Sequence, residues 1–185
     1  MSTEYQNFLA RKVCIARSDG FEVAPDAINA VLKPHQRTAV QWALRGGRRA
    51  LFESFGLGKT VQQLELARIA SERADGRGLI VCPLGVRGEF RRDAVEKLGW
   101  SEPPKFIRRI EEAGDHGVYL TNYETVRDGN LDPRLFQAAS LDEAAILASF
   151  GGTKTFREFM SLFAGDRKTM NSRERPRSVA MAEKI

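Results

Sequence analysis

The stretch Phe52-Glu53-Ser54-Phe55-Gly56-Leu57-Gly58-Lys59-Thr60 decides the fold of this chain. The apolar run Ala50-Leu51-Phe52 leads into it and predicts a short buried strand, whereas Val61, Leu64 and Ile69 follow it at helical spacing. Glycines let successive backbone N–H groups turn toward one anion, and the start of a helix adds a partial positive charge. The order of strand, glycine-rich loop and helix therefore predicts a phosphate-binding loop.

The residue types in this loop suit a nucleotide triphosphate bound with magnesium. The backbone of Gly56-Leu57-Gly58 would surround the phosphates, and Lys59 would reach the β- and γ-phosphates as a catalytic cation. The Thr60 hydroxyl would ligate Mg²⁺. The general pattern has glycine where this chain has Glu53, so a chance Gly-Lys-Thr at an ordinary strand-to-helix turn remains the alternative.

Length and composition limit the possible architectures. The 185 residues suffice for one α/β domain but not for two nucleotide-binding lobes. A net charge of +5 favours a polyanionic partner only weakly, because a small basic excess is common. The sequence shows neither a membrane-length apolar run nor a signal peptide, so we expect a cytoplasmic protein without membrane contact. Cys14 and Cys82 are expected to be reduced thiols.

Apolar segments alternate with helical patterns through the middle of the chain. Residues 78–83 and 118–123 are typical of buried strands, residues 136–141 form a milder apolar run, and residues 86–98 have helical spacing. This alternation predicts a layered α/β domain with a parallel sheet. Ligands of such sheets bind beyond the carboxyl ends of the strands, where the phosphate loop and Asp142-Glu143 are both expected.

The pair Asp142-Glu143 is the expected partner of the loop. Asp142 would hold Mg²⁺, usually through water, and Glu143 would act as the catalytic base that deprotonates the attacking water. An exposed acidic pair at the start of a helix is the alternative, because the helix dipole favours carboxylates there. The position after a strand favours the functional interpretation.

Five motifs in order resemble those of one known family. They are Leu32-Lys33-Pro34-His35-Gln36, Phe55-Gly56-Leu57-Gly58-Lys59-Thr60, Val81-Cys82-Pro83-Leu84, Thr121-Asn122-Tyr123-Glu124 and Leu141-Asp142-Glu143-Ala144. The chain resembles the first RecA-like lobe of a superfamily 2 helicase, closest to the Swi/Snf-type ATPases and their phage or prophage relatives. That family's Met-Gly-Leu-Gly-Lys-Thr form does not require glycine at the position of Glu53.

The resemblance implies a three-layer RecA-like α/β domain that binds ATP and Mg²⁺, with Gln36 hydrogen-bonded to adenine. It also implies that Pro83, Leu84 and the Thr121-Asn122 turn lie along a nucleic-acid path, although ordinary loops at strand ends explain them equally well. The basic residues of the following helix could contact phosphates, but a solvated helix face explains such a cluster better; they are Arg87, Arg91 and Arg92.

Domain limits follow from the same motifs. We expect an N-terminal helix and loop in residues 1–30, the ATP-binding lobe in residues 31–165, and a basic, disordered tail in residues 166–185. The family continues with a Ser/Thr-Ala-Thr motif on a central strand and then a second lobe with an arginine finger. Residues 177–182 lack those hydroxyls, so the sheet is expected to lack its last central strand and the chain to be an N-terminal fragment.

The resemblance implies an enzyme in the parent protein, which would hydrolyse ATP to move on nucleic acid, most simply double-stranded DNA. A non-catalytic module that binds ATP and nucleic acid, and needs a second lobe from elsewhere, is the alternative. A small-molecule kinase is disfavoured, because it would require neither the segment at Gln36 nor the Asp-Glu-Ala sequence at this spacing.

Overall fold

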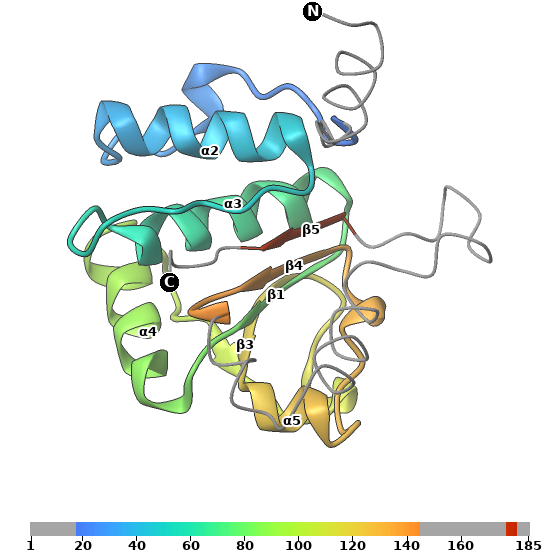
Figure 1. Ribbon diagram of the computed structural model, residues 1–185. Coiled ribbons are helices and arrows are strands. Elements are labelled where there is room, and N and C mark those ends of the chain that lie inside the picture. The colour runs from blue at the N-terminus through green and yellow to red at the C-terminus, as the bar shows by residue number, and fades with distance from the viewer. Residues whose placement is uncertain (1–17, 145–176, 181–185) are drawn as a thin grey trace, which may run out of the picture.

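The computed structural model describes residues 18–144 and the backbone of residues 177–180 (Figure 1). Its α-helices are α2 (Pro34–Gly46), α3 (Lys59–Arg73), α4 (Arg87–Glu96) and α5 (Tyr123–Arg127). Its strands are β1 (Arg77–Val81), β2 (Lys105–Phe106), β3 (Gly117–Thr121), β4 (Ala138–Leu141) and β5 (Arg177–Ala180). Short 3-10 turns span Pro25–Ala27, Leu84–Val86, Ile110–Glu112 and Pro133–Leu135.

The strands form one sheet in the order β2-β3-β1-β4-β5, and every neighbouring pair is parallel. In the central register, Val81 of β1 lies between Thr121 of β3 and Leu141 of β4. The last residues of these three strands are therefore side by side. The expected α/β class with a parallel sheet is confirmed, and the carboxyl ends of its strands share one edge.

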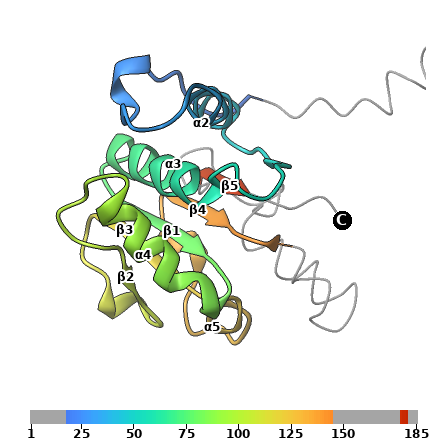
Figure 2. The ribbon, with the colours of Figure 1, turned by 90° about the vertical axis from the view of Figure 1, so that its left-hand side faces the viewer.

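Helices cover both faces of the sheet, because successive side chains of a strand point to opposite faces. Ile80 of β1 packs in the core under α2, α3 and α4, whereas Leu79 and Val81 pack in a second core with α5. Figure 2 shows α3 and α4 on one side of the sheet and α5 on the other, with α2 outside α3. The domain thus has the expected layers.

A buried carboxylate holds the segment before α2 against α3. Glu65 of α3 is fully buried and accepts hydrogen bonds from the Asn29 backbone N–H at 2.7 Å and from Arg68 Nη2 at 2.7 Å. The same Arg68 nitrogen also donates to the Ala27 carbonyl. The hydrogen bond to Glu65 is the main reason that the pKa of Arg68 lies above its usual range. Loss of one partner of such a buried pair costs about 3–5 kcal/mol, so this contact fixes the approach to α2.

Two predictions about strands are wrong. Residues 50–52 form no strand: Leu51 is buried, but Phe52 is 63% exposed, and no pairing joins this run to the sheet within the described residues. A strand without a neighbour has no partners for its backbone groups. The sheet also does not lack the strand after β4, because residues 177–180 of the expected disordered tail form β5, with Val179 opposite Ser140.

Other expectations fall outside the described residues or lack a test. The helices expected in residues 1–12 and 156–163 lie outside them, as does the rest of the predicted tail. The domain limits of residues 1–30, 31–165 and 166–185 stay predictions. None of the helices within residues 18–144 is long and apolar enough to cross a membrane.

Candidate functional site

The phosphate loop has the backbone that its glycines permit. Gly56 and Gly58 both lie in the left-handed region, with φ of +81° and +80°, and Gly58 caps the start of α3. A Cβ on Gly58 would lie 2.4 Å from Gln36 Nε2, whereas a Cβ on Gly56 would meet nothing within 4 Å. Gly58 is therefore required by conformation and by space, and Gly56 by conformation alone.

Side chains of the helix start hold the loop in shape. Lys59 Nζ donates to the Glu53 carbonyl at 3.1 Å and lies 5.0 Å from the centre of the Phe55 ring. Gln62 Nε2 donates to Glu53 Oε2 at 2.8 Å and to the Leu57 carbonyl at 3.3 Å. Glu53, which replaces a glycine of the general pattern, thus accepts hydrogen bonds through both its backbone and its side chain.

Gln36 is buried against this loop. Its Nε2 donates to the Leu57 carbonyl at 2.8 Å, and its Oε1 accepts from the Lys33 backbone N–H at 2.9 Å. The amide therefore links the start of α2 to the loop. A side-chain amide has two N–H donors and two acceptor lone pairs, so one of each remains for a ligand. The adenine contact stays a prediction.

Asp142 and Glu143 follow β4 at the edge where the strands end, and both are half-buried. The Asp142 N–H donates to the Val81 carbonyl at 2.8 Å, which extends the pairing of β4 with β1 by one residue. The Tyr123 hydroxyl donates to the Asp142 carbonyl. Glu143 has φ of +51°, so the chain turns sharply out of the sheet there. The backbone of the turn is thus held from both sides.

Burial shapes the electrostatics behind the turn. Cys82 follows β1 and is fully buried; its burial, followed by the Asp142 carboxylate, raises the pKa of the thiol to about 12. The same causes, in the same order, raise the pKa of the Tyr123 hydroxyl above its usual range. Both groups therefore stay neutral at physiological pH, and Tyr123 keeps the proton that it donates to Asp142.

Helix α4 connects the loop with the strand ends. It follows β1 closely, and Glu89 in its first turn accepts a hydrogen bond from the Thr60 hydroxyl, with Thr60 Oγ1 3.2 Å from Glu89 Oε1. Because β1 also pairs with the residues at Asp142, the loop and the Asp-Glu turn lie at one edge of the sheet. The structure brings the predicted site residues together in this sense.

The residues at this edge fit a magnesium nucleotide. Mg²⁺ prefers oxygen ligands and is usually held by one or two protein side chains together with phosphate oxygens. The Thr60 hydroxyl and the Asp142 carboxylate are such ligands, and Lys59 and the N-terminus of α3 supply positive charge for phosphates. The loop glycines leave the backbone open to an anion. These are the residues that would hold the group.

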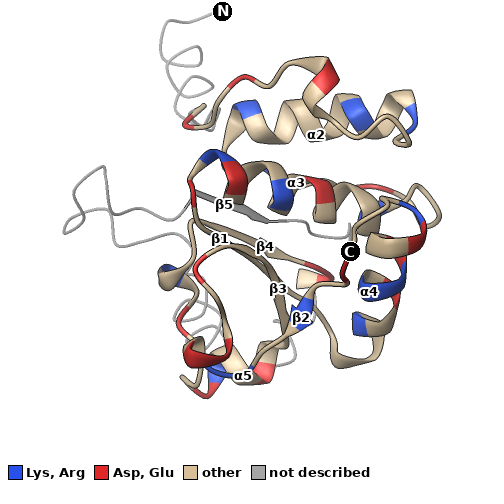
Figure 3. Cartoon of the chain, turned by 180° about the vertical axis from the view of Figure 1, so that it is seen from behind, with Lys and Arg blue, Asp and Glu red and all other residues tan. Residues whose placement is uncertain are grey.

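A basic and aromatic patch lies where β2 ends. The guanidinium carbons of Arg87 and Arg108 lie 5.4 and 5.5 Å from the centre of the Phe106 ring. Arg87, at the start of α4, was a candidate in the sequence, but Phe106 and Arg108 were not. The Arg108-Arg109 pair directly after an aromatic strand residue was the available signal. Figure 3 shows Lys and Arg on α4 and β2, at neighbouring parts of the fold.

The other arginines of α4 match their simpler interpretation. Arg91 and Arg92 are exposed, and Arg92 pairs with Asp93 at 3.6 Å and with Glu96 at 4.0 Å on its own helix. Pairs of this kind are typical of a solvated helix face. The structure therefore favours Arg87 over Arg91 and Arg92 as a contact for phosphates.

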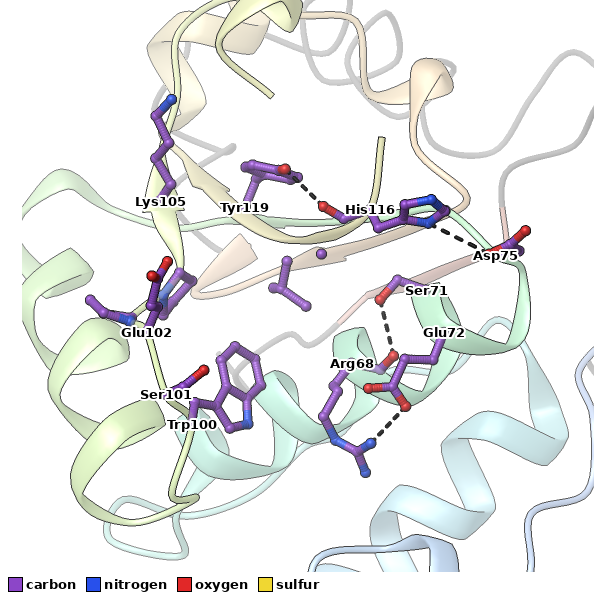
Figure 4. Close-up of a pocket in the computed structure, with 15 residues that line it drawn as sticks. Arg68, Ser71, Glu72, Asp75, Trp100, Ser101, Glu102, Lys105, His116 and Tyr119 are labelled. Carbon is purple, nitrogen blue, oxygen red and sulfur yellow. Dashed lines mark hydrogen bonds and ion pairs between the residues drawn. The ribbon is translucent and has the colours of Figure 1, made fainter. Parts of the chain in front are cut away.

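A cavity of about 750 Å³ lies at the opposite edge of the sheet, where the strands begin (Figure 4). Its lining is mixed in charge: Arg68 pairs with Glu72 at 2.7 Å, and His116 lies 3.6 Å from Asp75. None of the motif residues lines it. The candidate site is therefore the exposed edge with the loop, and not this cavity.

Comparison with solved structures supports a specific class of fold. The SWI2/SNF2 ATPase core of Sulfolobus solfataricus, solved in complex with double-stranded DNA, matches 88% of this chain with a TM-score of 0.60 and 20% identity. The UvsW helicase of bacteriophage T4 matches 96% with a TM-score of 0.57 and 19% identity. The chain thus has the RecA-like α/β fold of such cores. The predicted phage relationship stays a prediction, since this likeness shows the fold alone.

Sequence comparison finds Swi/Snf-type relatives. A Caenorhabditis elegans homologue of SWI/SNF-related matrix-associated actin-dependent regulator of chromatin subfamily A-like protein 1 is 39% identical over 80 residues, 38% of this chain. The DNA annealing helicase and endonuclease ZRANB3 of Bos taurus is 29% identical over 145 residues, 71% of this chain.

The similarity covers a small part of these relatives. The matched regions span 11% and 13% of their lengths, and 34% of the Sulfolobus chain. No family model matches the chain. The chain is therefore similar to Swi/Snf-type helicase-like ATPases over a region about the size of one lobe.

Proposed function

We propose that this chain is the N-terminal ATP-binding lobe of a DNA-dependent ATPase that couples ATP hydrolysis to movement on double-stranded DNA. The observation that carries the proposal is the loop at Gly58: its left-handed backbone begins α3 directly above the buried Gln36 amide. A chance Gly-Lys-Thr at an ordinary turn would not require that contact. The relatives named above, a helicase and chromatin ATPases, support the class of reaction.

Each residue at the edge then has a separate task. Lys59 exchanges its contact with the Glu53 carbonyl for the β- and γ-phosphates, and the N–H groups at the start of α3 face the same charge. Thr60 and Asp142 supply oxygens to Mg²⁺, which when bound neutralises charge on the phosphates. Glu143 accepts a proton from the attacking water.

The second requirement is a cation on the γ-phosphate as charge develops there. An arginine finger contributes on the order of 10³–10⁵ in rate in the triphosphatases where it has been studied. In the parent protein the second lobe would supply it. The isolated chain should therefore bind ATP but hydrolyse it slowly, with or without DNA.

The patch of Arg87, Phe106 and Arg108 is the proposed contact for DNA phosphates. Its two guanidinium groups share one aromatic ring at the edge where α4 begins, close to Pro83 and Leu84. Binding that rests on phosphate contacts falls steeply as salt rises. The Sulfolobus core was solved with double-stranded DNA, which supports duplex DNA as the partner of this chain.

Calorimetry with ATP and Mg²⁺ tests the nucleotide site. Lys59→Ala should weaken binding about tenfold or more, because a hydrogen bond to a charged group contributes about 1.5–3 kcal/mol. Lys105→Ala, at the start of β2, is the matched control and should bind as the wild type does. Unchanged affinity in a folded Lys59→Ala protein would reject the assignment.

Fluorescence anisotropy with a labelled duplex tests the DNA contact. Arg108→Ala should lower affinity at every salt concentration and reduce the dependence of log affinity on log salt by about one ion. Arg134→Ala removes an exposed arginine that pairs with Asp132 instead, and it should leave binding unchanged. Equal losses in both variants would mean that net charge, and not the patch, binds DNA.

A different class of function remains a second candidate, because β5 belongs to the sheet while a second lobe is not part of the matched region. In that case the chain is a binding module that turns over ATP only with another protein. Steady-state turnover of the purified chain, with and without duplex DNA, separates the two: robust DNA-stimulated turnover would require a finger in this chain or a second copy.

A further inference from the structure

We propose that Glu89 is a positioning residue for the magnesium site, acting through the Thr60 hydroxyl. This inference deepens the proposed function and rests on it. The two residues are 29 positions apart, and Thr60 Oγ1 donates to Glu89 Oε1 at 3.2 Å. Glu89 does not touch the phosphate loop motif in sequence, and its place in the site follows only from how α4 packs beside α3.

The chemistry of the contact gives it a direction. A threonine hydroxyl has one proton and two lone pairs, and an ionised carboxylate can only accept a hydrogen bond. The proton of Thr60 is therefore committed to Glu89, and the lone pairs of the same oxygen are left for a cation. Without the carboxylate, the hydroxyl is free to rotate and can point its proton at the metal position.

The fold fixes where Glu89 can reach. The next residue, Phe90, is 1% exposed and packs in the same core as Val61 and Leu64 of α3. The backbone of Glu89 therefore cannot move independently of the helix that carries Thr60. Glu89 is also the third residue of α4, where the helix dipole favours a carboxylate.

An exposed carboxylate near a hydroxyl has a simpler explanation, an incidental surface contact, and a contrary one. In the contrary case Glu89 competes with the nucleotide and metal for Thr60, so that its removal improves binding. Outer partners that orient metal ligands typically change metal affinity by about 10–100-fold when removed. The sign of the change in magnesium dependence therefore decides among the three.

The test measures how binding of a fluorescent ADP analogue depends on Mg²⁺ concentration. Glu89→Ala should raise the half-saturating Mg²⁺ concentration about tenfold. Glu89→Gln keeps an acceptor oxygen and should give a smaller rise. Glu96→Ala removes the same charge from the far end of α4 and should leave the curve unchanged. An unchanged or lowered half-saturating concentration in Glu89→Ala overturns the proposal.

A second measurement uses neither nucleotide nor metal. Urea midpoints of Thr60→Val, Glu89→Ala and the double variant report whether the two side chains interact in the protein alone. We expect the double variant to shift the midpoint by less than the sum of the single shifts, because each single change already removes the contact. Additive shifts would show that no contact exists and would overturn the proposal.

The two proposals fail in different ways. If the wild-type chain shows no magnesium-dependent nucleotide binding, the proposed function fails, and the inference about Glu89 is overturned with it. If the wild type binds and Lys59→Ala does not, while Glu89→Ala behaves as the wild type does, only the inference about Glu89 is overturned.

Discussion

The phosphate loop and the Asp142-Glu143 turn lie at the same edge of the sheet but are held in different ways. The loop depends on side chains, since Gln36 and Gln62 both donate to the Leu57 carbonyl. The turn depends on the sheet, because the Asp142 backbone continues the pairing with Val81.

The difference has consequences for how substitutions act at the two places. In the loop, shape and chemistry reside in the same residues, so a change of one side chain alters both. At the turn, the backbone position is set by strands that no carboxylate helps to form. Replacing a carboxylate there should alter the chemistry and leave the backbone in place.

The largest effect is expected at Gly58. Gly58→Ala places a Cβ 2.4 Å from Gln36 Nε2 at a φ of +80°, so the loop must distort or Gln36 must leave it. The left-handed conformation costs about 1–2 kcal/mol for a residue with a Cβ, and the lost hydrogen bond costs about 1 kcal/mol more. Urea unfolding should show the combined loss, and calorimetry a marked loss of ATP binding.

Gly56→Ala is the matched control, because its φ is +81° and nothing lies within 4 Å of the added Cβ. It should lose only the conformational share, about 1–2 kcal/mol. Equal losses in the two variants would mean that the contact with Gln36 does not hold the loop.

The next effect is at the turn. Asp142→Asn should raise the Mg²⁺ concentration needed for nucleotide binding about tenfold, with unfolding free energy close to that of the wild type. Glu143→Gln should bind nearly as the wild type does and should affect only hydrolysis in a protein that hydrolyses. Equal loss of binding in both variants would contradict the division of roles between the two carboxylates.

The same comparison explains what the sequence could predict. The loop, α3 and the carboxyl ends of the strands were predictable, because glycine positions and apolar periodicity are local signals. The contact of Thr60 with Glu89 and the position of Phe106 beside Arg108 join separate elements, and no local pattern encodes them. The site residues themselves stay predictions until variants are measured.

The two wrong predictions about strands have physical reasons. A three-residue apolar run at 50–52 cannot show whether both of its faces are covered, and Phe52 is exposed. The tail has few large apolar residues, which favoured disorder. Pairing with β4 gives Arg177–Ala180 backbone partners that its own composition does not reveal.

A smaller effect should follow from the hydroxyl that supports the turn. Tyr123→Phe removes the donor to the Asp142 carbonyl and leaves a buried acceptor without it. We expect a loss of about 1–2 kcal/mol in unfolding free energy and a slight rise in the Mg²⁺ requirement. The loop should not respond, so ADP binding without metal should be unchanged. A loss of that binding would show that the two regions are coupled more closely than their contacts indicate.

The smallest effect is in the pH dependence of stability, and it comes from Cys82 behind the turn. Burial and the Asp142 carboxylate raise the pKa of this thiol from 9.0 to about 12, so the folded chain keeps a proton that the unfolded chain loses. A raised folded pKa gives stability that is fully present below pH 9 and is lost as the pH rises toward 12. Between pH 7 and pH 9.5 the loss should be about 0.8 kcal/mol, because the unfolded thiol ionises within that range. Cys82→Ala removes the titrating group, so urea unfolding of the variant should show a shallower decline over the same range than the wild type. Parallel declines would mean that Cys82 does not retain its proton in the fold, and that the edge behind Asp142 is more open to solvent than its packing indicates.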